Sequence, residues 1–70
     1  MAASLGDVEK ALTFYEIGKK ILKQLYEVSP EMIFIKENLA TCYFSLGDIH
    51  ASLGNIKEAL SYYESSLELL

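Results

Sequence analysis

The chain has 70 residues, which is enough for one small domain with a modest core. Six lysines, no arginine and ten acidic residues give a net charge of −4, which excludes the clustered basic surface that nucleic-acid binding needs. A single cysteine cannot form an internal disulfide, and no apolar run approaches the roughly 20 residues that span a bilayer. Because the N-terminus also lacks the features of a signal peptide, we expect a soluble cytoplasmic protein.

The first predicted helix covers about residues 8–27, where apolar side chains recur at helical spacing. Residues 1–5 are expected to form only the last turn of an earlier helix, and Asp7 is the predicted N-cap. Glu16 and Lys20 lie four positions apart, as in an exposed ion pair. Gly18 costs about 1 kcal/mol relative to alanine inside a helix, so it indicates close approach of a neighbouring helix.

The second predicted helix covers about residues 30–53, with Ser29 as its N-cap and Pro30 at its first position. Its apolar residues step by three and four without a break, which predicts one continuous stripe. The stripe contains Met32, Ile35, Leu39, Cys42, Leu46, Ile49 and Leu53. A second stripe beside it contains mostly small residues, namely Ile33, Ala40, Phe44, Gly47 and Ala51. Two apolar stripes predict that this helix lies between two neighbours.

A turn-like segment interrupts the sequence of this helix at residues 45–48, which read Ser-Leu-Gly-Asp. A chain reversal there would leave residues 49–53 as little more than one helical turn, which is too short to be stable. We therefore predict one continuous central helix.

The third predicted helix covers about residues 56–70 and follows Gly54 and Asn55, with Glu58 placed for a capping box. Residues 52–64 repeat residues 4–16, with seven of thirteen pairs identical at a spacing of 48. A fixed internal period of this kind is typical of a stacked helical repeat.

The last 31 residues carry a pattern that resembles the tetratricopeptide repeat. The residues that carry the resemblance are Leu46, Gly47, Gly54, Ala59, Tyr63 and Ser66, with Ala11, Tyr15 and Gly18 in the earlier copy. His50 stands where the family usually has tyrosine. The period of 48 exceeds the usual 34 and resembles a longer bacterial-type variant. The resemblance implies an all-α fold of three antiparallel helices in one domain over residues 1–70, as a fragment of an α-solenoid.

Reactive side chains are sparse and scattered. Cys42 lies in the apolar stripe and is interpreted as a small buried hydrophobe, and His50 as a packed or half-exposed helix residue. Glu37 and Asp48 lie eleven positions apart, about 16 Å along a helix, which is too far for a pair of catalytic carboxylates. We expect no catalytic, cofactor or metal site, and no enzyme activity.

The resemblance implies a concave groove lined mainly by the central helix. The candidate groove residues are Phe34, Glu37, Asn38, Thr41, Phe44, Asp48 and Ser52. Phe34 is either an aromatic anchor in this groove or a side chain folded against the first helix on a solvated face; the sequence leaves both open. Without arginine, the family's clamp for a terminal carboxylate lacks a bidentate donor, so a basic or apolar ligand fits better.

Two functions follow as hypotheses. The leading one is a non-catalytic protein–protein interaction module or scaffold, part of a longer repeat array, that binds a protein or peptide and neither nucleic acid nor membrane. The alternative is a structural unit that self-associates into a homo-oligomer without a separate ligand. The apolar ends of the helical stack favour self-association, because stacked repeats need neighbours or polar caps. These end residues include Tyr62, Leu67, Leu69 and Leu70.

Overall fold

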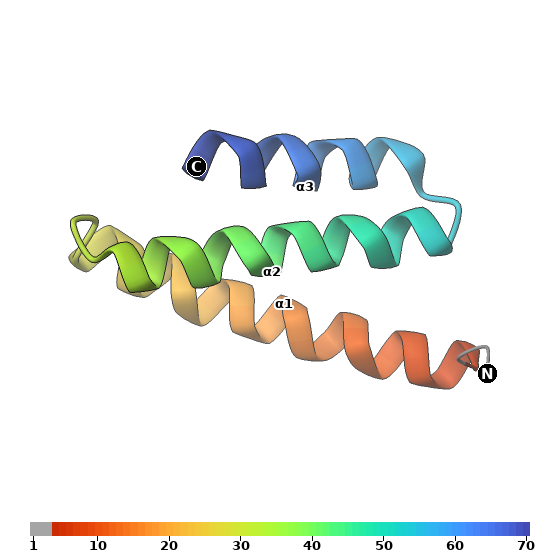
Figure 1. The fold of residues 1–70 in the computed structure, drawn as a ribbon. Coiled ribbons are helices and arrows are strands. Elements are labelled where there is room, and N and C mark those ends of the chain that lie inside the picture. Colours follow the sequence, from red (N-terminus) through yellow and green to blue (C-terminus); the bar gives the residue numbers. More distant parts are fainter. Residues whose placement is uncertain (1–3) are drawn as a thin grey trace.

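A computed structural model describes residues 4–70, which form three helices. They are α1 (Leu5–Val28), α2 (Ile33–Ser52) and α3 (Ile56–Leu69). Consecutive helices run antiparallel, and α2 lies between α1 and α3 (Figure 1). The predicted all-α stack of three helices is therefore confirmed.

The central helix is continuous, as predicted from its apolar stripe. Residues 45–48 lie inside α2, so the Ser-Leu-Gly-Asp sequence there does not reverse the chain. Leu39 and Leu46 from the stripe are the two largest fully buried side chains in the described part of the chain. Burying a leucine stabilises the folded state by about 1.5–3 kcal/mol, so this stripe holds the centre of the stack together.

Small residues bring α2 and α3 close together. Ala40 on α2 and Ala59 on α3 are both buried. A Cβ atom added at Gly47 would lie only 2.7 Å from the ring of Tyr63, so the glycine makes room for that ring. Ala40 and Gly47 of the second stripe thus pack against α3, as the sequence indicated, while Ile33 and Ala51 of that stripe remain exposed.

The start of α1 differs from the prediction. Ser4, not Asp7, is the N-cap: its Oγ accepts a hydrogen bond from the backbone N–H of Asp7 at 3.2 Å. Asp7 lies in the first turn, where its carboxylate favours the positive end of the helix dipole. The serine hydroxyl satisfies a free N–H one turn earlier than expected, so Leu5 begins the helix instead of ending a previous one. The rest of that expected turn, residues 1–3, lies outside the described residues.

The connection between α1 and α2 also differs. Ser29 ends α1, because its N–H donates to the Leu25 carbonyl at 2.9 Å. Pro30 and Glu31 then form a turn, closed by the N–H of Met32 on the Ser29 carbonyl at 3.1 Å. Met32 is the N-cap, so α2 begins about one turn later than the prediction of residue 30. The predicted cap at Ser29 is wrong because that residue still serves the first helix.

The turn between α2 and α3 lies at Gly54 and Asn55, as predicted, but the side-chain hydrogen bonds predicted for the start of α3 are absent. Gly54 has a φ of 83°. Its N–H bonds to the Ala51 carbonyl, while the Asn55 N–H bonds to the His50 carbonyl, which is a Schellman motif. Asn55 is the N-cap of α3, but its side chain makes no cap hydrogen bond. The predicted capping box therefore does not form.

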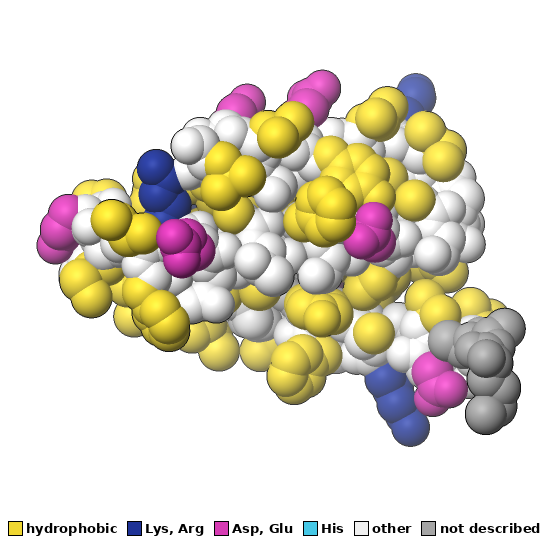
Figure 2. All heavy atoms as spheres, in the orientation of Figure 1, with side chains coloured by type: hydrophobic (Ala, Val, Ile, Leu, Met, Phe, Trp, Pro, Cys, Tyr) yellow, Lys and Arg dark blue, Asp and Glu magenta, His cyan; other side chains and the backbone are white. Residues whose placement is uncertain are grey.

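Hydrophobic side chains remain exposed along the whole stack. Figure 2 shows them spread over this face of the molecule, with a few acidic and basic groups between them. The most exposed large ones include Leu5, Phe14, Val28, Ile33, Phe34, Leu67 and Leu70. Among the described residues, none of the helices combines the length and low polarity that crossing a membrane requires.

Candidate functional site

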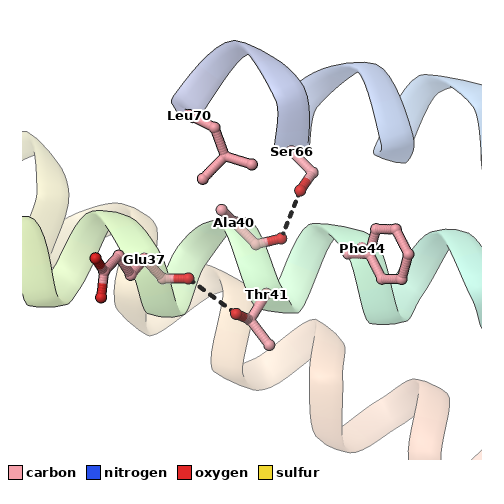
Figure 3. A pocket seen from close by; sticks show the side chains of 6 residues that line it. All are labelled: Glu37, Ala40, Thr41, Phe44, Ser66 and Leu70. Atoms are coloured by element: carbon pink, nitrogen blue, oxygen red, sulfur yellow. Dashed lines mark hydrogen bonds between the residues drawn. The ribbon is translucent and has the colours of Figure 1, made fainter.

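An open hollow lies between α2 and α3 (Figure 3). It encloses about 480 Å³. Its lining residues are Glu37, Ala40, Thr41 and Phe44 from α2, with Ser66 and Leu70 from α3. We call it the α2–α3 hollow.

The floor of the hollow is closed by a helix-to-helix hydrogen bond. Ser66 Oγ on α3 donates to the Ala40 carbonyl on α2 at 2.9 Å, and both residues are buried (Figure 3). A buried hydrogen bond of this kind contributes about 1 kcal/mol net. Because both side chains are small, the helices approach closely and leave the larger side chains above them to form the walls.

Phe44 forms an aromatic wall of the hollow. Its ring centroid lies 5.3 Å from that of Tyr63 on α3, in a tilted arrangement. The Tyr63 hydroxyl donates a hydrogen bond to Asp48 Oδ1, and this bond raises the pKa of Tyr63. Phe44 is nevertheless 55% exposed, so one side of its ring is free for a ligand. A half-exposed aromatic side chain held by neighbours is the kind of group that anchors protein interfaces.

The charge around the hollow is negative. Glu37 is the single ionisable residue in its lining, and Asp48 lies beyond the Phe44–Tyr63 pair. At the opposite end, a second and smaller depression adjoins the hollow because it shares Glu37 and Leu70. Its other lining residues are Ile33, Lys36 and Leu69.

Three polar side chains of the predicted groove are occupied by their own helix. Thr41 Oγ1 donates to the Glu37 carbonyl at 3.0 Å, Asn38 Nδ2 to the Phe34 carbonyl at 2.9 Å, and Ser52 Oγ to the Asp48 carbonyl at 3.1 Å. In each bond the side chain donates its hydrogen to a backbone carbonyl of the preceding turn. That hydrogen is then not available to an acceptor on a ligand. The polar arc of α2 therefore offers a ligand fewer hydrogen-bond donors than its sequence suggests.

The structure brings together only part of the predicted groove. Glu37, Thr41 and Phe44 line the hollow, while Phe34, Asn38, Asp48 and Ser52 are absent from its lining. Phe34 is 73% exposed, so it is not folded against α1, as one of the two interpretations required.

The residues that α3 contributes to the hollow could not be predicted from the sequence. Ser66 was identified as a small residue for close helix packing, and Leu70 as an apolar end residue. Nothing in their spacing told which α2 residues they would meet. The signal that was present is the pairing of small residues, Ala40 with Ser66, which marks where the two helices come closest.

Cys42 and His50, the other candidates from the sequence, are both packing residues. Cys42 is half-buried, and a Cβ atom at Gly18 would lie 3.7 Å from its Sγ. Burial raises the pKa of the thiol, which keeps it protonated and weakly nucleophilic. The His50 ring stacks on Tyr62, with 5.4 Å between centroids and 17° between planes. Within residues 4–70, no three metal-binding side chains gather in one place.

A second polar cluster joins α1 to α3. Lys19 Nζ lies 3.1 Å from both Glu16 Oε2 and the Tyr62 hydroxyl, and that hydroxyl donates to Glu16 Oε1 at 2.9 Å. Glu16 therefore pairs with Lys19 and not with Lys20, the partner expected from helical spacing. Tyr62 favours Lys19 as the partner of Glu16, because its hydroxyl reaches the side of α1 on which Lys19 lies.

Burial and hydrogen bonding oppose each other in this cluster. Burial alone would raise the pKa of Glu16, but hydrogen bonds from Tyr62 and Lys19 outweigh it and lower that pKa below its ordinary value. Burial alone would lower the pKa of Lys19, but its bonds to Tyr62 and Glu16 raise it. Both shifts favour the charged pair. The cluster has the character of a structural link and contains no reactive group.

Antiparallel helices joined by short turns, with small residues where they touch, define a helical-hairpin repeat protein. A family model described as tetratricopeptide repeat matches residues 1–70, so the chain belongs to the tetratricopeptide-repeat family. Searches of curated proteins and of solved structures gave no match. Members of this family typically serve as protein-interaction or scaffolding modules.

Proposed function

We propose that this chain is a non-catalytic protein–protein interaction module and that the α2–α3 hollow receives a side chain of its protein or peptide partner. The observation that carries the proposal is Phe44, which is held against Tyr63 on one side and is 55% exposed on the other. The family supports an interaction role in general, and the hollow is the proposed place for it.

The lining indicates the chemistry of the ligand. Phe44, Ala40 and Leu70 offer apolar contact, and the Glu37 carboxylate offers a partner for a cation. A segment that presents an apolar side chain beside a lysine or arginine matches both features. Lys36, in the adjoining depression, is one charged donor and cannot form a bidentate clamp for a carboxylate.

The shape of the hollow favours a peptide or helix over a small molecule. It is open to solvent, and its six lining residues come from the side-by-side helices α2 and α3. The hydrogen bond between Ser66 and Ala40 closes the floor between them. Small-molecule sites enclose most of their ligand, whereas a trough between two helices accepts side chains that project from an extended or helical segment. We expect weak to moderate affinity unless a larger surface of α2 takes part.

Selection from a displayed peptide library tests this proposal. We expect the full chain to enrich peptides with an apolar residue near a basic one, and Phe44→Ala to weaken their binding by at least tenfold while the circular dichroism spectrum stays unchanged. Glu37→Lys should shift the enriched charge from basic to acidic. Phe14→Ala is the matched control, because Phe14 is 75% exposed and lies on α1. Equal loss in both phenylalanine variants, or no enrichment, would refute the proposal.

Self-association without a ligand is the second candidate function, and exposed apolar residues on α1 favour it. Phe14, Ile17, Ile21, Leu25 and Val28 are all at least 46% exposed and recur at spacings of three and four. Such a stripe is wider than scattered surface hydrophobes and marks an interaction face. Sedimentation velocity at micromolar concentration tests it: we expect dimers or larger species that Ile21→Ser reduces, and a purely monomeric profile would contradict it.

A further inference from the structure

A second hollowed surface lies along α1, away from the α2–α3 hollow. It encloses about 610 Å³ and is open to solvent. Its lining includes Glu16, Ile17, Lys19, Lys20, Lys23 and Glu27. None of these residues lines the α2–α3 hollow, so the two sites are separate. We call this region the basic surface of α1.

The charge of this surface is opposite in sign to that of the whole protein. The chain has a net charge of −4, yet three of its six lysines lie between positions 19 and 23. A local concentration of positive charge attracts anionic groups. Three lysines with two glutamates beside them give too little charge for the many phosphate contacts of a nucleic-acid site, but enough for a few carboxylates.

The fold leaves two of these lysines without an acidic partner. By helical spacing, Lys20 would pair with Glu16, four positions earlier. In the structure both oxygens of that carboxylate are already bonded, Oε1 to the Tyr62 hydroxyl at 2.9 Å and Oε2 to Lys19 Nζ at 3.1 Å. Lys20 and Lys23 are exposed and form no ion pair within the described part of the chain. The link between α1 and α3 therefore leaves their charges available to a ligand.

Lys20 and Lys23 are placed to bind one acidic segment together. Residues three positions apart on a helix have Cβ atoms about 5–6 Å apart, so both ammonium groups reach the same bound segment. Lysine is a compact point charge with three donors, which suits the separate carboxylates of acidic side chains. Ile17 lines the same surface and is 57% exposed, which adds an apolar contact three positions before Lys20.

This arrangement of charges is specific to α1. Counted at the spacing of the internal repeat, Glu16 corresponds to Glu64 on α3, whereas Lys20 corresponds to Glu68. Lys20 and Glu68 are both exposed. Because exposed charges contribute little to stability, neither the helix nor its packing requires the lysine at this position. A role in binding accounts for the reversed charge.

We propose that the basic surface of α1 binds an acidic peptide segment of a protein partner, with carboxylates on Lys20 and Lys23 and an apolar side chain on Ile17. The contact is independent of the α2–α3 hollow, whose Glu37 selects a basic ligand. Two sites of opposite charge preference on different helices allow one chain to hold two different segments at the same time.

A nuclear magnetic resonance titration of the full chain tests the proposal, because it also locates weak binding. The probe is a short acetylated and amidated peptide in which glutamate alternates with leucine, and its glutamine counterpart controls for charge. We expect backbone amide shifts within residues 16–27 and binding that added salt weakens. Lys20→Gln with Lys23→Gln should weaken binding about three- to tenfold. Glu27→Gln should strengthen it, since a like charge beside the ligand is removed.

Lys10→Gln with Lys57→Gln is the matched control, because it removes two exposed lysines elsewhere and changes the net charge equally. Equal weakening in both double variants overturns the proposal, as does equal binding of the glutamine peptide. Phe44→Ala should leave the affinity for the acidic peptide unchanged, so this variant separates a failure of the hollow from a failure of this surface. A chain that ignores the peptide but binds phosphatidylserine vesicles overturns the proposal in favour of a membrane.

Discussion

The Tyr62 hydroxyl donates a hydrogen bond to Glu16 Oε1 at 2.9 Å and so joins residues that are 46 positions apart. The two residues lie on α3 and α1, which are on either side of α2 and do not pack against each other backbone to backbone in the described structure. Lys19 completes the link, with its ammonium group 5.2 Å from the centre of the Tyr62 ring. This link fixes the outer two helices relative to each other.

Tyr62→Phe should remove the link and keep the aromatic packing. The variant retains the stacking on His50 but loses the hydrogen bonds with Glu16 and Lys19. We expect the free energy of unfolding to fall by about 1–2 kcal/mol in urea titrations, because two hydrogen bonds to charged groups are lost. Tyr43→Phe is the control, because the half-buried Tyr43 ring lies 6.1 Å from the Tyr62 ring while its hydroxyl takes no part in the hydrogen bonds of the link. An equal effect in both variants would show that the link contributes nothing specific.

Acidification should weaken the same link. Because the folded-state pKa of Glu16 is lowered, its stabilising contribution is present above the ordinary carboxylate pKa and is lost as pH falls through the lowered value. Glu16→Gln should therefore reduce the loss of stability on acidification. The difference is expected to be a few tenths of a kcal/mol, since the Glu16 side chain is 41% exposed and solvent screens the pair.

At alkaline pH, the stability that the link contributes should fall as pH rises. The pKa of Lys19 is raised, so its contribution is present below the ordinary lysine pKa and is lost as pH rises through the raised value. Urea midpoints measured across both limbs for the parent chain, Glu16→Gln and the control Glu64→Gln provide the comparison. A Glu64→Gln profile that matches the Glu16→Gln profile would contradict this assignment.

Two glycines should respond to alanine in opposite directions. At Gly18 a Cβ atom would lie 3.7 Å from Cys42 Sγ, which is ordinary contact, so Gly18→Ala should stabilise the protein by about 0.5–1 kcal/mol through helix propensity. At Gly47 it would lie 2.7 Å from the Tyr63 ring and force that ring off Phe44. Gly47→Ala should therefore destabilise by about 1–3 kcal/mol. Thermal melts of the pair check the sign directly, and a stabilising Gly47→Ala would disprove the packing argument.

The cap of α1 can be assigned by substitution. Ser4→Ala removes the acceptor of the Asp7 N–H and should cost about 1 kcal/mol. Asp7→Asn keeps a polar side chain and changes only the charge near the helix start, so it should cost about 0.3–1 kcal/mol, less as salt is added. Urea titrations at low and high salt distinguish the two. A larger loss for Asp7→Asn would favour Asp7 as the cap, as the sequence alone had indicated.

Much of the fold was predictable because it depends on local spacing. The unbroken stripe through Leu39 and Leu46 determined that residues 45–48 are helical. A chain reversal there would leave the next few residues as a helix too short to be stable. Gly54 marked the turn into α3 because its positive φ suits glycine best. The internal repeat indicated a stack of similar helices, and the family match supports a tetratricopeptide repeat.

The helix starts were less predictable, because several residues in a row are able to cap. Ser4 and Asp7 are both good N-caps, and the helix begins after the earlier one, Ser4. Around Ser29 the sequence favours a cap followed by proline, yet the preceding helix retained that residue and Met32 took the role. Local preference ranks such candidates closely, and packing of the flanking helices decides between them.

For this protein, the sequence by itself determined which residues share a helix face, because a side chain's direction repeats every 3.6 residues whatever surrounds it. Only the tertiary structure decided which faces meet. In the folded chain Tyr62 bonds to Lys19, and this lysine, not Lys20, pairs with Glu16. Ser66 likewise bonds to the Ala40 carbonyl and closes the floor of the hollow. Those outcomes depend on how closely two rigid helices approach, which the small residues permit but no single stretch of sequence specifies.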